Sequence, residues 1–160
     1  MATHAVPATT TRRAWWGWLA FALSVLGLGV SAYLTIDHFA RVRLICSDSG
    51  VINCQKVTTS AQSHFLGIPV AVLGLAFYLV LVAINWPPLW RSADSRIHWL
   101  RLMLLCGGML FVLYLVSVEL FVIGNICLWC TSVHMLTFLL FALTLITAPT
   151  MLRQSAPTNG

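Results

Sequence analysis

The sequence predicts an all-α integral membrane protein, a four-transmembrane-helix bundle with an outer cysteine-bearing loop. Of its 160 residues, 59% are hydrophobic and only 8% are charged, whereas a soluble domain has about 25% charged residues. Four apolar runs each come close to the ~20 residues that a helix needs to cross a bilayer. The length allows one domain, and its apolar surface is expected to face lipid.

Polar or helix-breaking segments separate the four runs. Two prolines at 87–88 end the second run, and Gly124 and Asn125 divide the third from the fourth, so these two helices should form a tight hairpin. Pro69 lies near the start of the second run, where a first helical turn tolerates its missing N–H. The expected spans are residues 14–36, 68–86, 98–123 and 125–148. The chain then divides into a disordered cytoplasmic N-terminus at 1–13, the membrane domain at 14–148 and a cytoplasmic tail at 149–160.

Basic residues predict the orientation, because cytoplasmic segments carry an excess of Lys and Arg. With four spans, one side of the membrane holds Arg12, Arg13, Arg91, Arg96, Arg101 and Arg153, and the other holds Arg41, Arg43 and Lys56. We therefore expect both termini in the cytoplasm and the cysteine pairs outside, in a bacterial inner membrane. The net charge of +5 is a topology signal, and no basic run suggests nucleic acid. An aromatic belt at the cytoplasmic interface is expected from Trp15, Trp16, Trp18, Trp86, Trp90 and Trp99.

Cys127 and Cys130 form a C-x-x-C at the start of the fourth span. Their spacing of three residues puts both sulfurs on one helix face, and the positive end of the helix dipole stabilises a thiolate there. The pair lies on the side where disulfides persist, so the pattern predicts redox activity. Two alternatives remain. The cysteines are unrelated, or they form a zinc site of about four ligands with Cys46 and Cys54.

Cys46 and Cys54 bracket seven residues rich in Ser, Gly, Asp and Asn, which is typical of a flexible loop. One interpretation is a structural disulfide that closes this loop. The other is a shuttle that exchanges with an outside thiol protein and then with the C-x-x-C pair. The fifth cysteine, Cys106, lies in the middle of a span and is expected to be a small buried apolar residue.

These features together resemble the vitamin K epoxide reductase family. The resemblance rests on the Cys46 and Cys54 spacing, on LGIPVAVLG at 66–74 and on LFVIGNICLWC at 120–130. The order of these elements also fits, and the similarity covers residues 14–148. Quinone-linked thiol oxidases of the DsbB type also have four spans and two cysteine pairs, but their C-x-x-C lies in the first outer loop, whereas here it comes last.

The resemblance implies a four-helix bundle around a quinone, either ubiquinone or menaquinone, capped by the outer loop and by a short helix near residues 58–65. Cys127 and Cys130 would form the active-site pair, with Cys130 nearer the quinone. Cys54 would attack Cys127 to relay electrons. Cys46 would exchange with the partner, a separate thioredoxin-like protein outside the cytoplasm.

The resemblance also implies polar contacts to the quinone. The family has one polar residue four positions after the second active-site cysteine, where this chain has His134. It has another just before the second span, near Ser63 or His64. The alternatives are an interhelical hydrogen bond for His134 and an interface position for His64. Glu119, two turns before Cys127, is either solvated at the interface or an aid to proton transfer.

The sequence therefore predicts an enzyme, a membrane thiol–disulfide oxidoreductase. It would pass electrons from a thioredoxin-like partner through both cysteine pairs to a membrane quinone, and so support disulfide bond formation. One alternative is an enzyme whose main role is the reduction of a quinone or a quinone epoxide. The other is a non-catalytic four-span protein whose cysteines bind zinc or only staple its outer loop.

Overall fold

The computed structural model describes residues 8–40, 45–46, 50–91 and 95–154. Its long helices are α1 (Ala8–Ala40), α3 (Val70–Ile84), α5 (Ser95–Ser117) with its π-helical continuation η2 (Val118–Ile123), and α6 (Leu128–Gln154). Its short elements are α2 (Cys54–Thr58), the 3-10 turn η1 (Ala61–Ser63), the strands β1 (His64–Phe65) and β2 (Ile68–Pro69), and α4 (Pro87–Arg91). The described part is therefore mostly helical, as expected.

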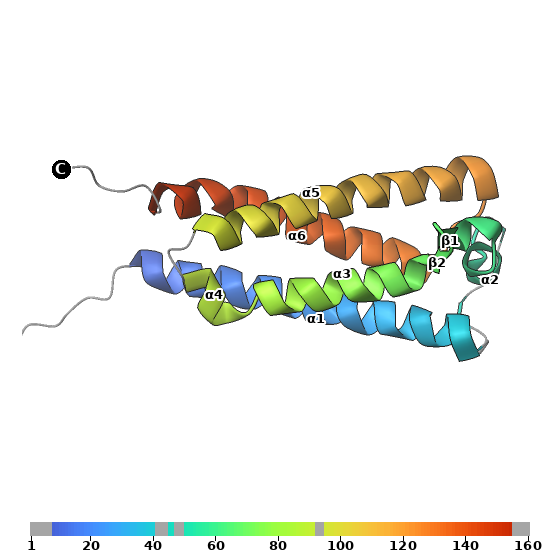
Figure 1. The fold of residues 1–160 in the computed structure, drawn as a ribbon, viewed down its shortest axis with the longest axis horizontal. Helices are drawn as coiled ribbons and strands as arrows, with labels where there is room; N and C mark the ends of the chain where they lie inside the picture. Colours follow the sequence, from blue (N-terminus) through green and yellow to red (C-terminus); the bar gives the residue numbers. More distant parts are fainter. Residues whose placement is uncertain (1–7, 41–44, 47–49, 92–94, 155–160) are drawn as a thin grey trace, which may run out of the picture.

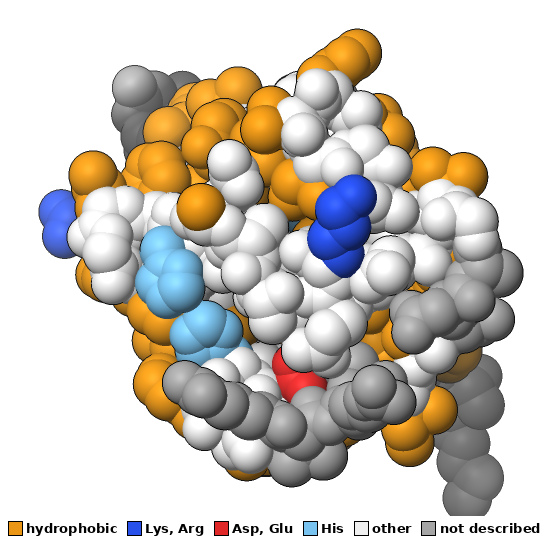
Figure 2. Space-filling model, turned by 90° about the vertical axis from the view of Figure 1, so that its right-hand side faces the viewer, with side chains coloured by type: hydrophobic (Ala, Val, Ile, Leu, Met, Phe, Trp, Pro, Cys, Tyr) orange, Lys and Arg blue, Asp and Glu red, His pale blue; other side chains and the backbone are white. Residues whose placement is uncertain are grey.

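The long helices lie side by side along one axis (Figure 1). Helix α1 packs against α3 and α6, and α5 packs against α6, so the expected hairpin of the last two helices is present. Helix α2 and the β1–β2 hairpin lie at one end of the bundle, which we call the loop end, and α4 lies at the opposite end (Figure 1). Polar side chains and backbone occupy the middle of the loop end, and hydrophobic side chains lie around them (Figure 2).

Three of the four expected spans are long and apolar enough to cross a membrane, namely Trp15–Ala40, Arg96–Ile123 and Leu128–Pro149. Helix α3 is shorter. Its 15 residues extend about 22 Å at 1.5 Å per residue, against roughly 30 Å of hydrocarbon.

The start of α3 differs from the expectation because a hairpin precedes it. Leu66 and Gly67 have φ values of 53° and 82°, as a two-residue type I′ turn requires. This turn pairs β1 with β2 in an antiparallel ladder. Pro69 therefore caps α3 from an extended conformation, with ψ of 130°, and the expectation that it lies in the first helical turn was wrong.

Other boundaries also differ. Helix α1 begins at Ala8, inside the stretch expected to be disordered, whose residues 1–7 lie outside the described part. Helix α6 does not end before Pro149 but continues to Gln154, because a proline removes only its own N–H and membrane helices tolerate that loss. The short helix expected near residues 58–65 begins earlier, at Cys54, because the Asn53 side chain caps it.

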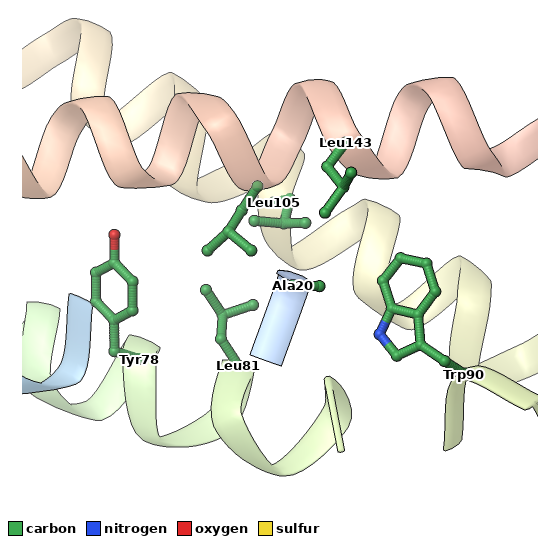
Figure 3. Packing of buried hydrophobic residues seen from close by; sticks show 7 residues of the cluster. Ala20, Tyr78, Leu81, Trp90, Leu105 and Leu143 are labelled. Carbon is green, nitrogen blue, oxygen red and sulfur yellow. The ribbon is translucent and has the colours of Figure 1, made fainter. Parts of the chain in front are cut away.

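At the opposite end, Arg101 lies within α5 and not in a loop, with 1% of its surface exposed. Its guanidinium donates to the carbonyl of Ile84 at 2.6 Å and lies 4.3 Å from the ring centroid of Trp90. Trp90 also donates to the Asn85 side chain. Trp90 is consequently part of the core (Figure 3), and its assignment to the aromatic belt was wrong. The more exposed tryptophans are Trp15, Trp18, Trp86 and Trp99.

Tight packing between α1 and α3 gives a stability prediction. A Cβ at Gly27 would overlap the ring of Tyr78, whereas one at Gly29 would meet nothing within 4 Å. Overpacking of this kind costs about 1–3 kcal/mol, so we expect Gly27→Ala to lower the thermal midpoint in detergent. Gly29→Ala is the matched control and should be close to neutral. Equal midpoints for the two variants would contradict this packing.

Candidate active site

The outer cysteine pair is a disulfide between Cys46 and Cys54. Cys54 is the first residue of α2, whose N-terminus is fixed because Asn53 Oδ1 accepts the backbone N–H of Lys56 at 2.8 Å. Cys54 is fully buried, whereas Cys46 is only partly buried. Of the two sulfurs, that of Cys46 is therefore the more accessible to a molecule approaching the loop end.

The inner pair, Cys127 and Cys130, consists of free thiols. Gly124 ends η2 in the left-handed conformation, with φ of 65°, and Cys127 lies directly before α6. The sulfur of Cys127 accepts the backbone N–H of Cys130 at 3.3 Å and so acts as an N-terminal cap. A hydrogen bond from the Cys130 thiol lowers the pKa of Cys127 below its ordinary value, although burial opposes this effect. Cys127 is therefore the sulfur better prepared to be a thiolate.

Backbone pairing brings the two cysteine pairs together. Ile52 and Ile126 form an isolated parallel bridge, in which the N–H of Asn53 donates to the Ile126 carbonyl at 3.1 Å and the N–H of Ile126 donates to the Val51 carbonyl at 2.9 Å. Asn125 strengthens the bridge by donating to the Val51 carbonyl at 3.2 Å. Cys54 and Cys127 each follow a strand of this bridge within two residues, so the bridge fixes their relative position.

Cys54 and Cys127 belong to one buried cluster with Leu34 and Val57, and Cys46 and Cys130 pack against it. Trp129, between the two inner cysteines, donates from its indole to the carbonyl of Ile45 at 3.1 Å. The hydroxyl of Tyr33 accepts the N–H of Ile45 at 3.3 Å, and the rings of Tyr33 and Trp129 lie 4.8 Å apart. The residue before Cys46 is thereby attached to the middle of the C-x-x-C.

A cavity of about 710 Å³ with mainly apolar walls lies beside the inner cysteine pair. Cys130 and the predicted contacts His134 and Ser63 line this cavity, and His134 is 7% exposed. His64 is not among the residues that line it. The Ser63 hydroxyl and His64 Nδ1 are 3.2 Å apart, and the His64 ring lies 5.2 Å from that of His38, which does line the cavity. Histidine side chains are visible on this end in Figure 2.

Several polar residues of the cavity were not selected from the sequence. The Ser31 hydroxyl is buried and has no hydrogen-bond partner among the described residues. The Tyr78 hydroxyl donates to the Val133 carbonyl at 3.0 Å and pairs with the Thr137 hydroxyl at 2.9 Å. Polar residues inside apolar spans usually face a bundle interior or cavity, and this signal identifies Ser31 and Thr137 in the sequence.

Glu119 also lines the cavity and is 7% exposed. Its carboxyl lies near the Cys127 backbone and the Cys130 thiol and interacts with both. It is therefore a buried residue of the site and not a solvated interface residue. Across the described ranges, no group of three or more His, Cys, Asp or Glu residues is arranged to hold a metal ion.

The fold and the site together define a membrane protein whose two cysteine pairs, one a disulfide and one a dithiol, pack against each other beside an apolar cavity. The chain belongs to the vitamin K epoxide reductase family, because the family model matches residues 18–145, most of its length. This is a family of oxidoreductases, and the chain accordingly acts in membrane redox chemistry that involves disulfides.

Proposed function

We propose that this protein is a membrane thiol–disulfide oxidoreductase that takes electrons from a thioredoxin-like partner and delivers them to a membrane quinone. The observation that supports this most strongly is the buried cluster that contains Cys54 and Cys127, against which Cys46 and Cys130 pack, with Cys130 lining the large cavity. Electrons would enter at Cys46 and Cys54 and leave from Cys127 and Cys130. The net result would be disulfide formation in exported proteins.

The cavity suits a quinone. Its apolar walls suit the ring and the isoprenoid tail of a membrane quinone. Sites for small ligands typically have volumes of about 300–1,000 Å³ and contain a few polar groups. The hydroxyl of Ser31, which has no hydrogen-bond partner within the described part of the chain, can bond to a ligand inside it. His134 and Ser63 would hold the quinone, with His64 acting through its contact to Ser63. When bound, the quinone would itself accept the two electrons from the inner cysteine pair.

The order of thiol exchange follows from exposure. A partner dithiol would attack the more accessible Cys46 and reduce the outer disulfide, becoming a disulfide itself. The thiolate of Cys54 would then attack Cys127 in an inner disulfide and release Cys130. Cys46 would attack Cys54 in turn, which re-forms the outer disulfide and leaves two inner thiols. The bonding in the structure, an outer disulfide and an inner dithiol, is the same as the state that this relay would leave.

A direct test uses the purified protein in lipid nanodiscs with a reduced thioredoxin-like protein and a quinone. We expect partner thiols to be oxidised at a rate that depends on the quinone. Faster turnover of a quinone epoxide would favour the alternative in which quinone chemistry is the main role. Bound zinc with no redox change on adding quinone would favour the non-catalytic alternative.

The proposal places the loop end outside a bacterial inner membrane and both termini in the cytoplasm, with α3 as the fourth crossing. We therefore expect a thiol reagent that cannot cross membranes to label reduced Cys46 in intact cells. A cysteine introduced by Ser92→Cys, at a position outside the described residues, should react only after the cells are opened. Labelling of that cysteine from outside would reverse the orientation.

His134 is one helical turn beyond Cys130, and its ring lines the same cavity. A neutral imidazole can donate a hydrogen bond to a carbonyl oxygen that becomes negative during reduction. We expect His134→Ala to lower quinone turnover by about 10- to 100-fold, as loss of one such donor does. His134→Tyr should retain most activity, because a phenol also donates.

Exchange between the partner and the outer disulfide is the internal control for His134→Ala, and it should proceed at the native rate. Full quinone turnover by His134→Ala at limiting quinone would mean that the histidine is only a tether between helices.

A further inference from the structure

Glu119 has an unusual backbone setting. It lies in η2, where six residues, Val118–Ile123, are π-helical at the end of α5. A π-helical turn contains an extra residue and so changes the direction of the side chains, and such turns are frequent at functional sites. The next three residues face outward, with Leu120, Phe121 and Val122 between 50% and 85% exposed, whereas Glu119 is 7% exposed.

The carboxyl of Glu119 has specific neighbours. It lines the cavity together with Cys130 and His134, and it interacts with the Cys130 thiol and the Cys127 backbone. An ionisable group inside a membrane segment is costly, and a buried carboxylate needs hydrogen-bond donors. The Cys130 thiol has one proton, which it can donate either to the Cys127 sulfur or to Glu119, and it carries this proton only while the inner pair is reduced. The hydrogen bonding of Glu119 therefore changes with the redox state of the cysteines.

The chemistry of Cys130 requires a nearby proton carrier. When Cys54 attacks Cys127, Cys130 leaves as a thiolate and must gain a proton. When the inner pair is oxidised again, Cys130 must lose that proton. Cys130 is half-buried and packs against the buried cluster and the apolar cavity, so an acid–base group beside its sulfur offers the shortest path for that proton.

We propose that Glu119 is the proton carrier for Cys130. In the relay, the sulfur–sulfur bond between Cys127 and Cys130 breaks as one forms between Cys54 and Cys127, and the proton moves from the Glu119 carboxyl to the Cys130 sulfur. The products are a neutral thiol and a carboxylate. In the reverse direction the carboxylate accepts the proton of the Cys130 thiol. This role rests on the proposed relay, but it does not depend on the identity of the final electron acceptor.

Infrared difference spectroscopy tests the proton directly. The full chain in nanodiscs without quinone is measured with the inner pair as a disulfide and again after reduction by dithiothreitol. We expect the carbonyl-stretch band of a neutral carboxyl in the oxidised state to disappear on reduction. Glu119→Gln should lack this band and Glu119→Asp should shift it. The same difference spectrum in Glu119→Gln and in the native protein would overturn the proposal.

A kinetic measurement tests the consequence. Oxidised protein without quinone is mixed with saturating dithiothreitol, quenched with acid and alkylated, and the thiols of Cys127 and Cys130 are counted by mass spectrometry. Loss of a general acid costs about 100-fold or more, so Glu119→Gln should slow the appearance of the inner thiols by about that factor. Glu119→Asp should recover part of the rate.

Leu120→Ala is the matched control, because it changes the next residue of the same π-helical turn on its exposed side, and it should relay at the native rate. A native relay rate in Glu119→Gln would overturn the proposal even if the protein proved active with quinone. Failure of quinone reduction in the native protein, together with a slowed relay in Glu119→Gln, would instead reject the proposed electron acceptor and leave the role of Glu119 intact.

Discussion

Cys130→Ala should abolish quinone-dependent thiol oxidation while the protein stays inserted and folded. Cys130 lines the cavity, and its thiol hydrogen-bonds to Cys127. Without it, the inner disulfide between Cys127 and Cys130 cannot form, and the two electrons cannot leave as a pair. We expect turnover in nanodiscs to fall to the uncatalysed rate, and Cys127→Ala to behave in the same way.

Cys106→Ala is the control for the loss of a thiol as such. Cys106 is a free cysteine within α5, and it is not among the described residues that line the cavity. Its replacement should leave turnover close to native. Near-normal turnover by Cys130→Ala, or a comparable loss in Cys106→Ala, would show that the redox pairing of the cysteines is wrong.

Cys54→Ala should stop electron transfer from the partner protein to the inner pair. Cys54 is buried against Cys127 in one cluster, whereas Cys46 is more accessible and suited to the partner. With Cys54 absent, a partner thiol can still join Cys46, but no second cysteine is present to resolve that bond. We expect partner-driven turnover to fall to background and a mixed disulfide between Cys46 and the partner to accumulate on non-reducing gels.

The companion variant Cys46→Ala distinguishes the role of Cys46, which is exchange with the partner, from the role of Cys54, which is transfer to the inner pair. The remaining Cys54 is fully buried, so it should trap much less of the partner than Cys46 does. In Cys54→Ala, an inner pair reduced by a small dithiol should still be oxidised by quinone. Native partner-driven turnover in Cys54→Ala would contradict the relay through the outer pair.

The sequence predicted the long helices and a membrane redox role that involves disulfides, because both depend on local patterns. Long apolar runs and the position of Cys127 at a helix start are visible in the order of residues. The bridge between Ile52 and Ile126 is not, since it joins segments far apart in the chain that have no special spacing. That bridge, which brings Cys54 to Cys127, became apparent only from the structure.

Some local features of the structure depart from what is usual for their residue types, and these could not be predicted from the sequence. The positive φ of Leu66 is unusual for a side chain of that size, and it creates the hairpin that delays the start of α3. The π-helical turn has no clear sequence signal, so Glu119 remained ambiguous. Trp90 resembled an interface residue until its contact with the buried Arg101 placed it in the core.

A single-turnover experiment tests the central claim of electron transfer from the inner cysteine pair to a quinone. Protein with both pairs reduced is mixed without oxygen with one equivalent of quinone, and the remaining thiols are mapped by mass spectrometry at successive times. We expect quinone reduction to coincide with the appearance of the Cys127–Cys130 disulfide, while Cys46 and Cys54 are still thiols at the earliest times. Oxidation of the outer pair first, or a quinone that stays oxidised while all four thiols persist, would contradict the proposed path.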